Sequence, residues 1–405
     1  MISLNVELHG ELIGRLVGDG KRKFDFVVEP HAVESHGLGS HILSLSVPLL
    51  LNQPAAKASR RRNFFAELLP EGDNLANLAA AIRVTTDDVP QLLAQYGRDV
   101  AGAVQIYDPL IPGEPKTPAL LAVSGFEVAE LLRNAQREPL GNSPRRGRTS
   151  LAGVQDKIVL AANSAGWNRV VDGYPSTHIL KPVTRQYPTM IYDEEYGQRI
   201  CRLLGLANFG VEIESFDGQE ALVIERFDRT ADDSPKRIHQ EDMNQALGAS
   251  KNEKYQEFGG KVSLKRISEV LAASATGDSL ERLLKQLTVA LAIGNLDMHA
   301  KNLSIFHFGD GSFDLTPAYD MVPQMHLDAD GKMALAINGK YHHAQINGTD
   351  LAIEGDSWGI QNADEIVRTT LGNVLEVVAN EQTHPNAYPQ LRADIEAFTN
   401  RLISS

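Results

Sequence analysis

Three polar residues late in the chain have the types and spacing that phosphoryl transfer requires. Four residues separate Asp297 from Asn302, and Asp320 follows after an apolar run at 303–306 and the segment 315–319. One carboxylate can orient a hydroxyl group and accept its proton, while an amide and a second carboxylate can hold Mg²⁺ against nucleotide phosphates. A chain with 52 acidic residues can also produce this spacing by chance. The interpretation therefore depends on what lies upstream.

A lysine, a carboxylate and a hinge precede these residues in the order that protein kinases use. Lys181 ends the strand-like run 177–180, and Glu194 lies on a helix predicted over 193–204. The apolar run 221–224 then enters a polar turn whose backbone could bind the edge of an adenine. The hinge residues are Glu225, Arg226, Phe227 and Asp228. A solvated lysine at a strand end and an ordinary edge strand are the alternatives.

The segment 150–157 is the candidate loop over the phosphates. It is neither a G-x-G-x-x-G loop nor a Walker A motif, but its backbone N–H groups could cradle phosphate oxygens. The residues predicted to bind the nucleotide here are Ala152, Gly153, Val154, Gln155 and Lys157. The spacing alone is a weak signal.

Two residues between Asp297 and Asn302 are further candidates. His299 could orient the loop through hydrogen bonds or fill space, and Lys301 could neutralise a phosphoryl group during transfer. The other histidines, including His342 and His343, lack acidic partners at ligand spacing. The sequence therefore predicts no transition-metal site.

The composition restricts the class of protein. The net charge of −13 disfavours direct DNA binding, although a basic partner could recruit the chain to DNA. The single cysteine, Cys201, excludes an internal disulfide and favours a reducing, cytoplasmic location. No run approaches the roughly 20 apolar residues that span a bilayer, and residues 1–7 do not resemble a signal peptide.

Hydrophobic periodicity divides the chain into a β-rich front half and a mainly helical back half. Strands are expected over 2–28 and at 102–107, 158–161, 177–181 and 211–225, and helices over 62–82, 86–96, 126–134, 193–204, 263–273, 278–294, 363–380 and 387–403. Thr85 or Thr86 could cap the second helix, and Asp278 with Glu281 has the spacing of a capping box. The candidate loop directly follows the strongest helix of the back half.

Six ordered motifs resemble the HipA family, the serine/threonine kinase toxins of HipA–HipB toxin–antitoxin modules. They are SLAGVQDK (150–157), THILK (177–181), ERFDR (225–229), QEDM (240–243), GNLDMHAKN (294–302) and LTPAYD (315–320). The segments 63–70 and 96–104 also resemble the family's amino-terminal subdomain. The resemblance implies an α+β, protein-kinase-like bilobal fold. Its parts would be an amino-terminal subdomain (1–140), a β-rich nucleotide-binding lobe (141–239) and a helical catalytic lobe (240–405).

The resemblance also implies roles for the residues that match its motifs. Asp297 would be the catalytic base, Asn302 and Asp320 would hold Mg²⁺, and Lys181 would contact the phosphates of ATP. The backbone at 225–227 would take the adenine, and the loop 152–155 would cover the phosphates. Ser150 matches the position of autophosphorylation, which displaces that loop and switches the kinase off. We expect Arg145, Arg146 and Arg148 to bind the displaced phosphoserine.

The implied partners are a HipB-like DNA-binding antitoxin and a protein substrate. The substrate would be an aminoacyl-tRNA synthetase, with glutamate–tRNA ligase the leading candidate, and DNA would be reached only through the antitoxin. Two other functions remain open. The chain could phosphorylate a small molecule or lipid, or it could be a non-catalytic co-repressor that tightens the antitoxin on DNA. Replacing Asp297 would leave every activity unchanged in the last case.

Overall fold

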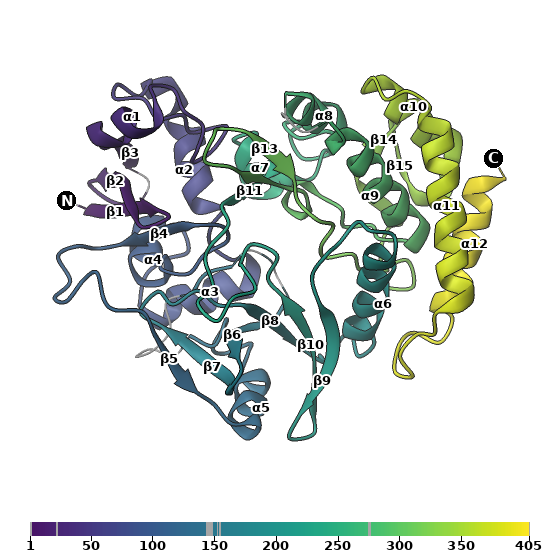
Figure 1. Ribbon diagram of the computed structural model, residues 1–405, viewed down its shortest axis with the longest axis horizontal. Coiled ribbons are helices and arrows are strands. Elements are labelled where there is room, and N and C mark those ends of the chain that lie inside the picture. Colours follow the sequence, from purple (N-terminus) through teal and green to yellow (C-terminus); the bar gives the residue numbers. More distant parts are fainter. Residues whose placement is uncertain are drawn as a thin grey trace.

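The computed structural model of the chain describes residues 2–21, 23–142, 149–151, 153, 155–273 and 277–404. Figure 1 shows three parts in chain order. We call them the front subdomain (described residues of 2–107, purple to blue), the middle lobe (119–225, blue to teal) and the helical lobe (240–403, green to yellow). The first residues lie in the front subdomain, and the C-terminus lies at the outer edge of the helical lobe.

The front subdomain is a four-stranded antiparallel sheet covered by helices. The strand order is β3-β2-β1-β4, and alternate residues of β1 are buried because one face of the sheet packs on the core. Phe26 of β3 meets Phe65 of α2 there, with ring centroids 5.4 Å apart. The elements are β1 (Ile2–Leu8), β2 (Glu11–Gly18), β3 (Phe24–Val28), α1 (Pro30–His36), η1 (Ala55–Lys57), α2 (Ala58–Ala66), α3 (Gly72–Ala81), α4 (Val89–Tyr96) and β4 (Val104–Tyr107).

Two helix predictions in this region were wrong in their bounds. The helix expected over 62–82 is two helices, because Pro70 cannot continue the first one and α3 begins only at Gly72. The helix expected from Thr86 begins at Val89, after Asp88, with Pro90 in its first turn. The break at Pro70 matters for the site, since it creates a turn over residues 67–71 that faces the helical lobe.

The middle lobe is built on a six-stranded sheet of order β5-β7-β6-β8-β10-β9. Its elements are β5 (Ala119–Ala122), α5 (Gly125–Arg133), β6 (Ile158–Asn163), β7 (Gly166–Val171), β8 (His178–Pro182), α6 (Met190–Leu203), β9 (Val211–Phe216) and β10 (Gln219–Glu225). Ser124 and Glu127 form a reciprocal capping box that starts α5. The hydrophobic pattern predicted neither β5 nor β7. Because β5 pairs with β7, residues 119–122 belong to this sheet although they precede the predicted boundary at residue 140.

The helical lobe packs around α9. The second half of that helix, residues 287–293, is buried on every side, and Leu283, Leu287 and Leu291 are at most 1% exposed. Asp278 precedes it but makes no side-chain cap, so the predicted capping box with Glu281 was wrong. The elements are β11 (Gln240–Asp242), α7 (Met243–Ala246), η2 (Lys251–Lys254), α8 (Leu264–Ala272), α9 (Ser279–Ile293), η3 (Ala300–Asn302), β12 (Ser304–His307), β13 (Phe313–Leu315), β14 (Lys332–Ile337), β15 (Lys340–His342), η4 (His343–Gln345), α10 (Gly348–Ser357), α11 (Ala363–Asn380) and α12 (Leu391–Ile403).

Gly294 ends α9 and turns the chain into the candidate loop. It has φ 71° and ψ 33°, a left-handed conformation that glycine adopts without a Cβ clash. A Cβ there would lie 2.6 Å from Cγ of Met325. The mixed sheets and helices confirm the predicted α+β class. Within the described ranges, no helix combines the length and apolar composition needed to cross a membrane.

Candidate active site

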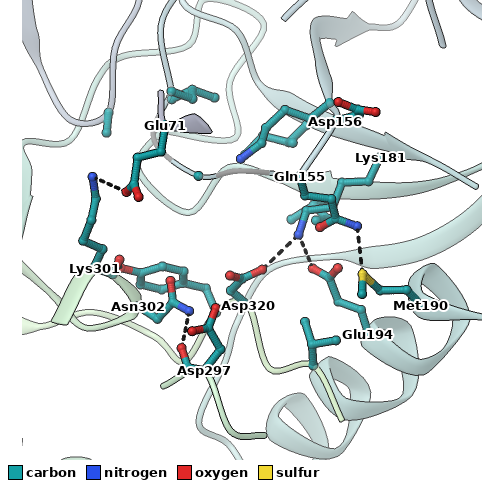
Figure 2. Close-up of a pocket in the computed structure, with 18 of the residues that line it drawn as sticks. Glu71, Gln155, Asp156, Lys181, Met190, Glu194, Asp297, Lys301, Asn302 and Asp320 are labelled. Carbon is teal, nitrogen blue, oxygen red and sulfur yellow. Dashed lines mark hydrogen bonds and ion pairs between the residues drawn. The ribbon is translucent and has the colours of Figure 1, made fainter. Parts of the chain in front are cut away.

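A cavity of about 880 Å³ contains most of the residues that the sequence singled out. The middle lobe and the helical lobe both line it, and the turn over residues 67–71 of the front subdomain lines it as well. Figure 2 shows Lys181, Asp297, Asn302 and Asp320 converging there. Of the residues that the sequence predicted for the site and that the structure describes, the following line the cavity: Gly153, Gln155, Lys157, Lys181, Glu194, Glu225, Arg226, Phe227, Asp228, Asp297, His299, Lys301, Asn302 and Asp320.

Asp297 is held by its neighbours on both sides. Its backbone N–H donates to Oδ1 of Asn295 over 3.0 Å, and its backbone carbonyl accepts from Nδ2 of Asn302 over 2.8 Å. The hydroxyl of Tyr255 donates to its Oδ1 over 3.0 Å. Burial raises the pKa of Asp297 to about 6, although the Lys254 ammonium acts in the opposite direction. A carboxylate with such a pKa is a suitable proton acceptor near neutral pH.

Asp320 and Lys181 form the charged centre of the cavity. Nζ of Lys181 lies 2.6 Å from Oε1 of Glu194 and 2.9 Å from Oδ1 of Asp320. Burial opposes ionisation of Asp320, but Lys181 outweighs it and lowers the pKa of Asp320 to about 2. The backbone of Asp320 has φ 56°, an uncommon value for a residue other than glycine. Lys181 and Glu194 therefore form an ion pair, with Asp320 as a third member.

The donor set of Asn302 and Asp320 is compatible with Mg²⁺. Because Nδ2 of Asn302 donates to the Asp297 carbonyl, its Oδ1 is the atom left for a cation. Asp320 adds a carboxylate that stays ionised, and hard oxygen ligands completed by water and phosphate are the usual surroundings of Mg²⁺. No group of three His, Cys, Asp or Glu side chains in the described part of the chain could hold a metal by itself.

The loop before β6 brings a second lysine to the cavity. Gly153 has φ 110°, and a Cβ there would lie 2.6 Å from Nζ of Lys157. Burial, reinforced by Lys181, lowers the pKa of Lys157 to about 8. The carbonyl of Gln155 accepts from Nδ2 of Asn74 over 3.2 Å, which ties this loop to α3. Ala152 and Val154 lie outside the described residues.

Ser150 is fully buried at the start of the same loop. Its hydroxyl donates to the carbonyl of Leu68 over 2.7 Å, and its N–H donates to the carbonyl of Asp99 over 3.0 Å. Both partners belong to the front subdomain. Phosphorylation of Ser150 therefore requires this segment to leave its position. Arg145, Arg146 and Arg148 lie outside the described residues.

The predicted hinge residues divide into two kinds. Arg226 and Asp228 form a buried pair, with Nη2 to Oδ2 at 2.8 Å, so only their backbone is available to a nucleotide. The carboxylate of Glu225 accepts from the N–H of Gly210 over 2.7 Å. Phe227 packs against Tyr319 with ring centroids 5.1 Å apart, which supplies an aromatic wall beside the hinge.

Lys301 and His299 both contact other side chains of the site. Nζ of Lys301 lies 2.6 Å from Oε2 of Glu67 and 2.9 Å from Oε1 of Glu71, so its charge is matched by two carboxylates. Burial lowers the pKa of His299 to about 3, and its Nε2 lies 3.7 Å from Oδ2 of Asp297, too far for a hydrogen bond. A neutral His299 packs edge-on against Tyr255 instead.

Sequence reasoning missed the residues that surround Asp297 from outside its own loop. These are Glu67, Glu71, Lys254 and Tyr255. Glu67 and Glu71 are more than 200 positions from the loop that they contact. No local spacing signals such a contact, which arises only because the front subdomain folds against the helical lobe.

Comparison with known proteins identifies the family of the chain. Residues 149–380 match the model of the HipA-like C-terminal domain, and residues 4–107 match that of the HipA N-terminal domain. A putative kinase of Sinorhizobium fredii is 32% identical over 360 residues, covering 85% of this chain and 83% of that protein. A serine/threonine-protein kinase toxin HipA of Shewanella oneidensis is 28% identical over 402 residues, covering 93% and 90%.

A solved structure has the same fold over the whole chain. It is a HipA of Shewanella oneidensis MR-1 in complex with HipB and its operator DNA. The TM-score is 0.77 at 24% identity, and the match covers 99% of this chain and 96% of that chain. The predicted two-lobed architecture with an additional front subdomain is confirmed at the level of the fold.

Proposed function

The chain belongs to the HipA family, and from this premise we propose that it is an ATP-dependent serine/threonine protein kinase acting as the toxin of a toxin–antitoxin module. One observation carries the proposal. Asp297, with a pKa of about 6, lies in one cavity with the Lys181–Asp320 pair and with Asn302. A base, a cation-binding carboxylate and a phosphate-binding lysine are the parts that phosphoryl transfer needs.

Each side chain has a defined task in this proposal. Asp297 orients a serine or threonine hydroxyl through the oxygen that Tyr255 leaves free, and accepts its proton. Lys181, fixed by Glu194, binds phosphate oxygens of ATP. Asn302 and Asp320 would hold Mg²⁺, which supplies positive charge against the phosphates when it is bound. The aromatic wall at Phe227 and the backbone at 225–227 receive the adenine.

Membership of the family supports a proposal for the partner and the target. The structural neighbour is described as a complex of HipA, HipB and operator DNA, so we propose a HipB-like antitoxin, with DNA reached through it. The net charge of −13 fits a basic partner better than DNA itself. The proposed target is an aminoacyl-tRNA synthetase in the cytoplasm, glutamate–tRNA ligase first, whose phosphorylation would stop translation and growth.

Ser150 is the proposed site of control. Its hydroxyl is buried against the Leu68 carbonyl, and a phosphate group adds a charge of about −1.5 to −2. That charge cannot return to this position, so the loop that contacts the nucleotide would stay displaced. The basic residues Arg145, Arg146 and Arg148 would then bind the phosphoserine.

The test compares phosphopeptides from cells that express the wild-type chain, Asp297→Asn, or the exposed control Asp364→Asn. We expect growth arrest, phospho-Ser150 and phosphorylated target peptides with wild type and Asp364→Asn, and none of them with Asp297→Asn. Identical phosphopeptides and growth for all three proteins would instead support a non-catalytic co-repressor. Turnover of ATP with no protein-bound phosphate would support a small-molecule kinase.

A further inference from the structure

The turn between α2 and α3 enters the active site from the front subdomain. Figure 2 shows the Glu71 side chain pointing to Lys301 of the candidate loop. Its Oε1 lies 2.9 Å from Nζ of Lys301, and its Oε2 lies 2.9 Å from Nζ of Lys254. One carboxylate therefore bridges two segments of the helical lobe, the η2 turn and the loop that carries Asp297.

Lys254 is adjacent in sequence to a residue that contacts Asp297. The next residue, Tyr255, donates its hydroxyl to Oδ1 of Asp297 over 3.0 Å. Nζ of Lys254 also lies 5.2 Å from the centre of the Tyr255 ring, and the ring meets that of His299 at 5.3 Å. The position of this tyrosine is thus coupled to the position of the lysine that Glu71 holds.

Other bonds anchor the same segment on both sides. Glu67 Oε1 accepts the N–H of Lys251 over 2.7 Å, and Glu67 Oε2 lies 2.6 Å from Nζ of Lys301. On the far side, the N–H of Gln256 donates to the carbonyl of Ala334 over 3.1 Å. Residues 251 and 256 are thus each bonded to a neighbouring element, and Glu71 binds the side chain of Lys254 between them.

We propose that Glu71 is a positioning residue for Asp297, acting through Lys254 and Tyr255, so that the front subdomain is a working part of the phosphotransfer site. This inference rests on the proposed kinase function. The Glu71 carboxylate holds the ammonium group of Lys254, whereas Lys301 is paired with Glu67 as well. Removing the charge of Glu71 therefore removes the carboxylate that holds Lys254, the residue next to Tyr255. Catalytic groups displaced by about 1 Å can lose roughly 100-fold in rate.

The test measures phosphate transfer from γ-labelled ATP to the full-length chain, at varied ATP, for wild type, Glu71→Gln, Tyr255→Phe and the double variant. Glu269→Gln, on the exposed face of α8, is the charge-matched control. We expect each single variant to lower the maximal rate by about 10- to 100-fold, with the KM for ATP close to wild type. The rate of the double variant should lie within about threefold of the rate of the slower single variant, because Glu71 acts on Asp297 through Tyr255 and the two losses therefore do not multiply.

Several results would overturn the inference. Glu71→Gln as fast as Glu269→Gln would do so, as would rate losses that multiply in the double variant. If Glu71→Gln unfolds, the result for Tyr255→Phe decides, since that variant loses only one hydroxyl group. A wild-type rate for Tyr255→Phe would contradict the proposal that Glu71 acts on Asp297 through Tyr255. Absence of phosphate transfer by the wild-type chain is a different outcome, which counts against the proposed kinase function itself.

Discussion

Two groups of polar residues in this chain differ in how completely their charges are paired. The closed cluster consists of Asp99, Arg226, Asp228, Arg229 and Arg237, where the front subdomain meets the hinge. The open site consists of Lys181, Glu194, Asp297, Asn302 and Asp320. Every charge in the closed cluster has an opposite charge within 4.0 Å, whereas Asp297 has a tyrosine hydroxyl and a cavity.

The two aspartates show what the difference does. Burial acts against ionisation of both Asp228 and Asp297. Two guanidinium groups, those of Arg226 and Arg229, hold the pKa of Asp228 well below its usual range, while the pKa of Asp297 rises to about 6. A buried carboxylate with complete partners is structural, and one with incomplete partners is available for proton transfer. Substitutions in each group can test this division.

The largest expected effect is on catalysis, in the open site. Asp297→Asn should lower the rate of phosphate transfer by about 10²- to 10⁴-fold, because it removes the proton acceptor. The thermal midpoint should stay the same or rise, since a desolvated carboxylate is replaced by a neutral group of similar shape. Autophosphorylation rate and thermal unfolding measure the two quantities. A large loss of stability would mean that Asp297 belongs with the structural charges.

The corresponding change in the closed cluster should affect stability. Asp228→Asn leaves the Arg226 and Arg229 guanidinium groups with less opposing charge, which costs about 3–5 kcal/mol in the free energy of unfolding when a buried pair is broken. Urea denaturation checks this, with Asp217→Asn at the exposed tip of the β9–β10 hairpin as the control. Equal unfolding midpoints for the two variants would show that the cluster does not stabilise the junction.

A buried histidine between the front subdomain and the helical lobe, His239, should also make the stability of the fold depend on pH. Burial lowers the pKa of His239 to about 3, and the ring bonds to the Leu43 carbonyl over 2.8 Å. The unfolded chain binds this proton near pH 6.5 and the folded chain does not, so stability falls as the pH drops from about 6.5 towards 3. The slope is at most about 1.4 kcal/mol per pH unit.

The variant His239→Gln isolates this contribution. Its free energy of unfolding should change less between pH 7 and pH 5 than that of the wild type, because glutamine does not titrate. Comparing differences between the two proteins removes the opposing contributions of carboxylates such as Asp242, whose pKa burial raises to about 7. Parallel pH profiles of the two proteins would be inconsistent with a neutral, buried His239.

The parts of the open site that lie in one short segment were predictable from sequence. The gap between Asp297 and Asn302 is fixed by one loop, and the strand at Lys181 and the helix at Glu194 have local hydrophobic patterns. The β-rich front half and the helical back half followed in the same way. The resemblance of the motifs to one family then joined these segments into a single site.

The contacts that join distant segments were not predictable. Glu71 bridges Lys254 and Lys301, and Asp99 pairs with Arg229, across more than 100 residues in each case. Such pairs leave no periodicity, because each residue is an ordinary charged residue in its own segment. Lys301 illustrates what the sequence leaves out. Its place in the loop suggested a contact with phosphate, but the fold turns it to two glutamates.

An exposed ion pair completes the comparison, because it shows how much pairing contributes to stability when the charges are not buried. Lys285 and Glu281 lie one turn apart on α9, with Nζ to Oε2 at 3.9 Å and side chains 39% and 49% exposed. Water already solvates both groups, so Glu281→Gln should change the free energy of unfolding by no more than about 0.5 kcal/mol. The rate of phosphate transfer should not change. Urea denaturation of Glu281→Gln and Asp228→Asn under the same conditions gives the ratio of their losses in the free energy of unfolding. A loss comparable to that of the buried aspartate would mean that pairing alone, without desolvation, distinguishes the closed cluster from the open site.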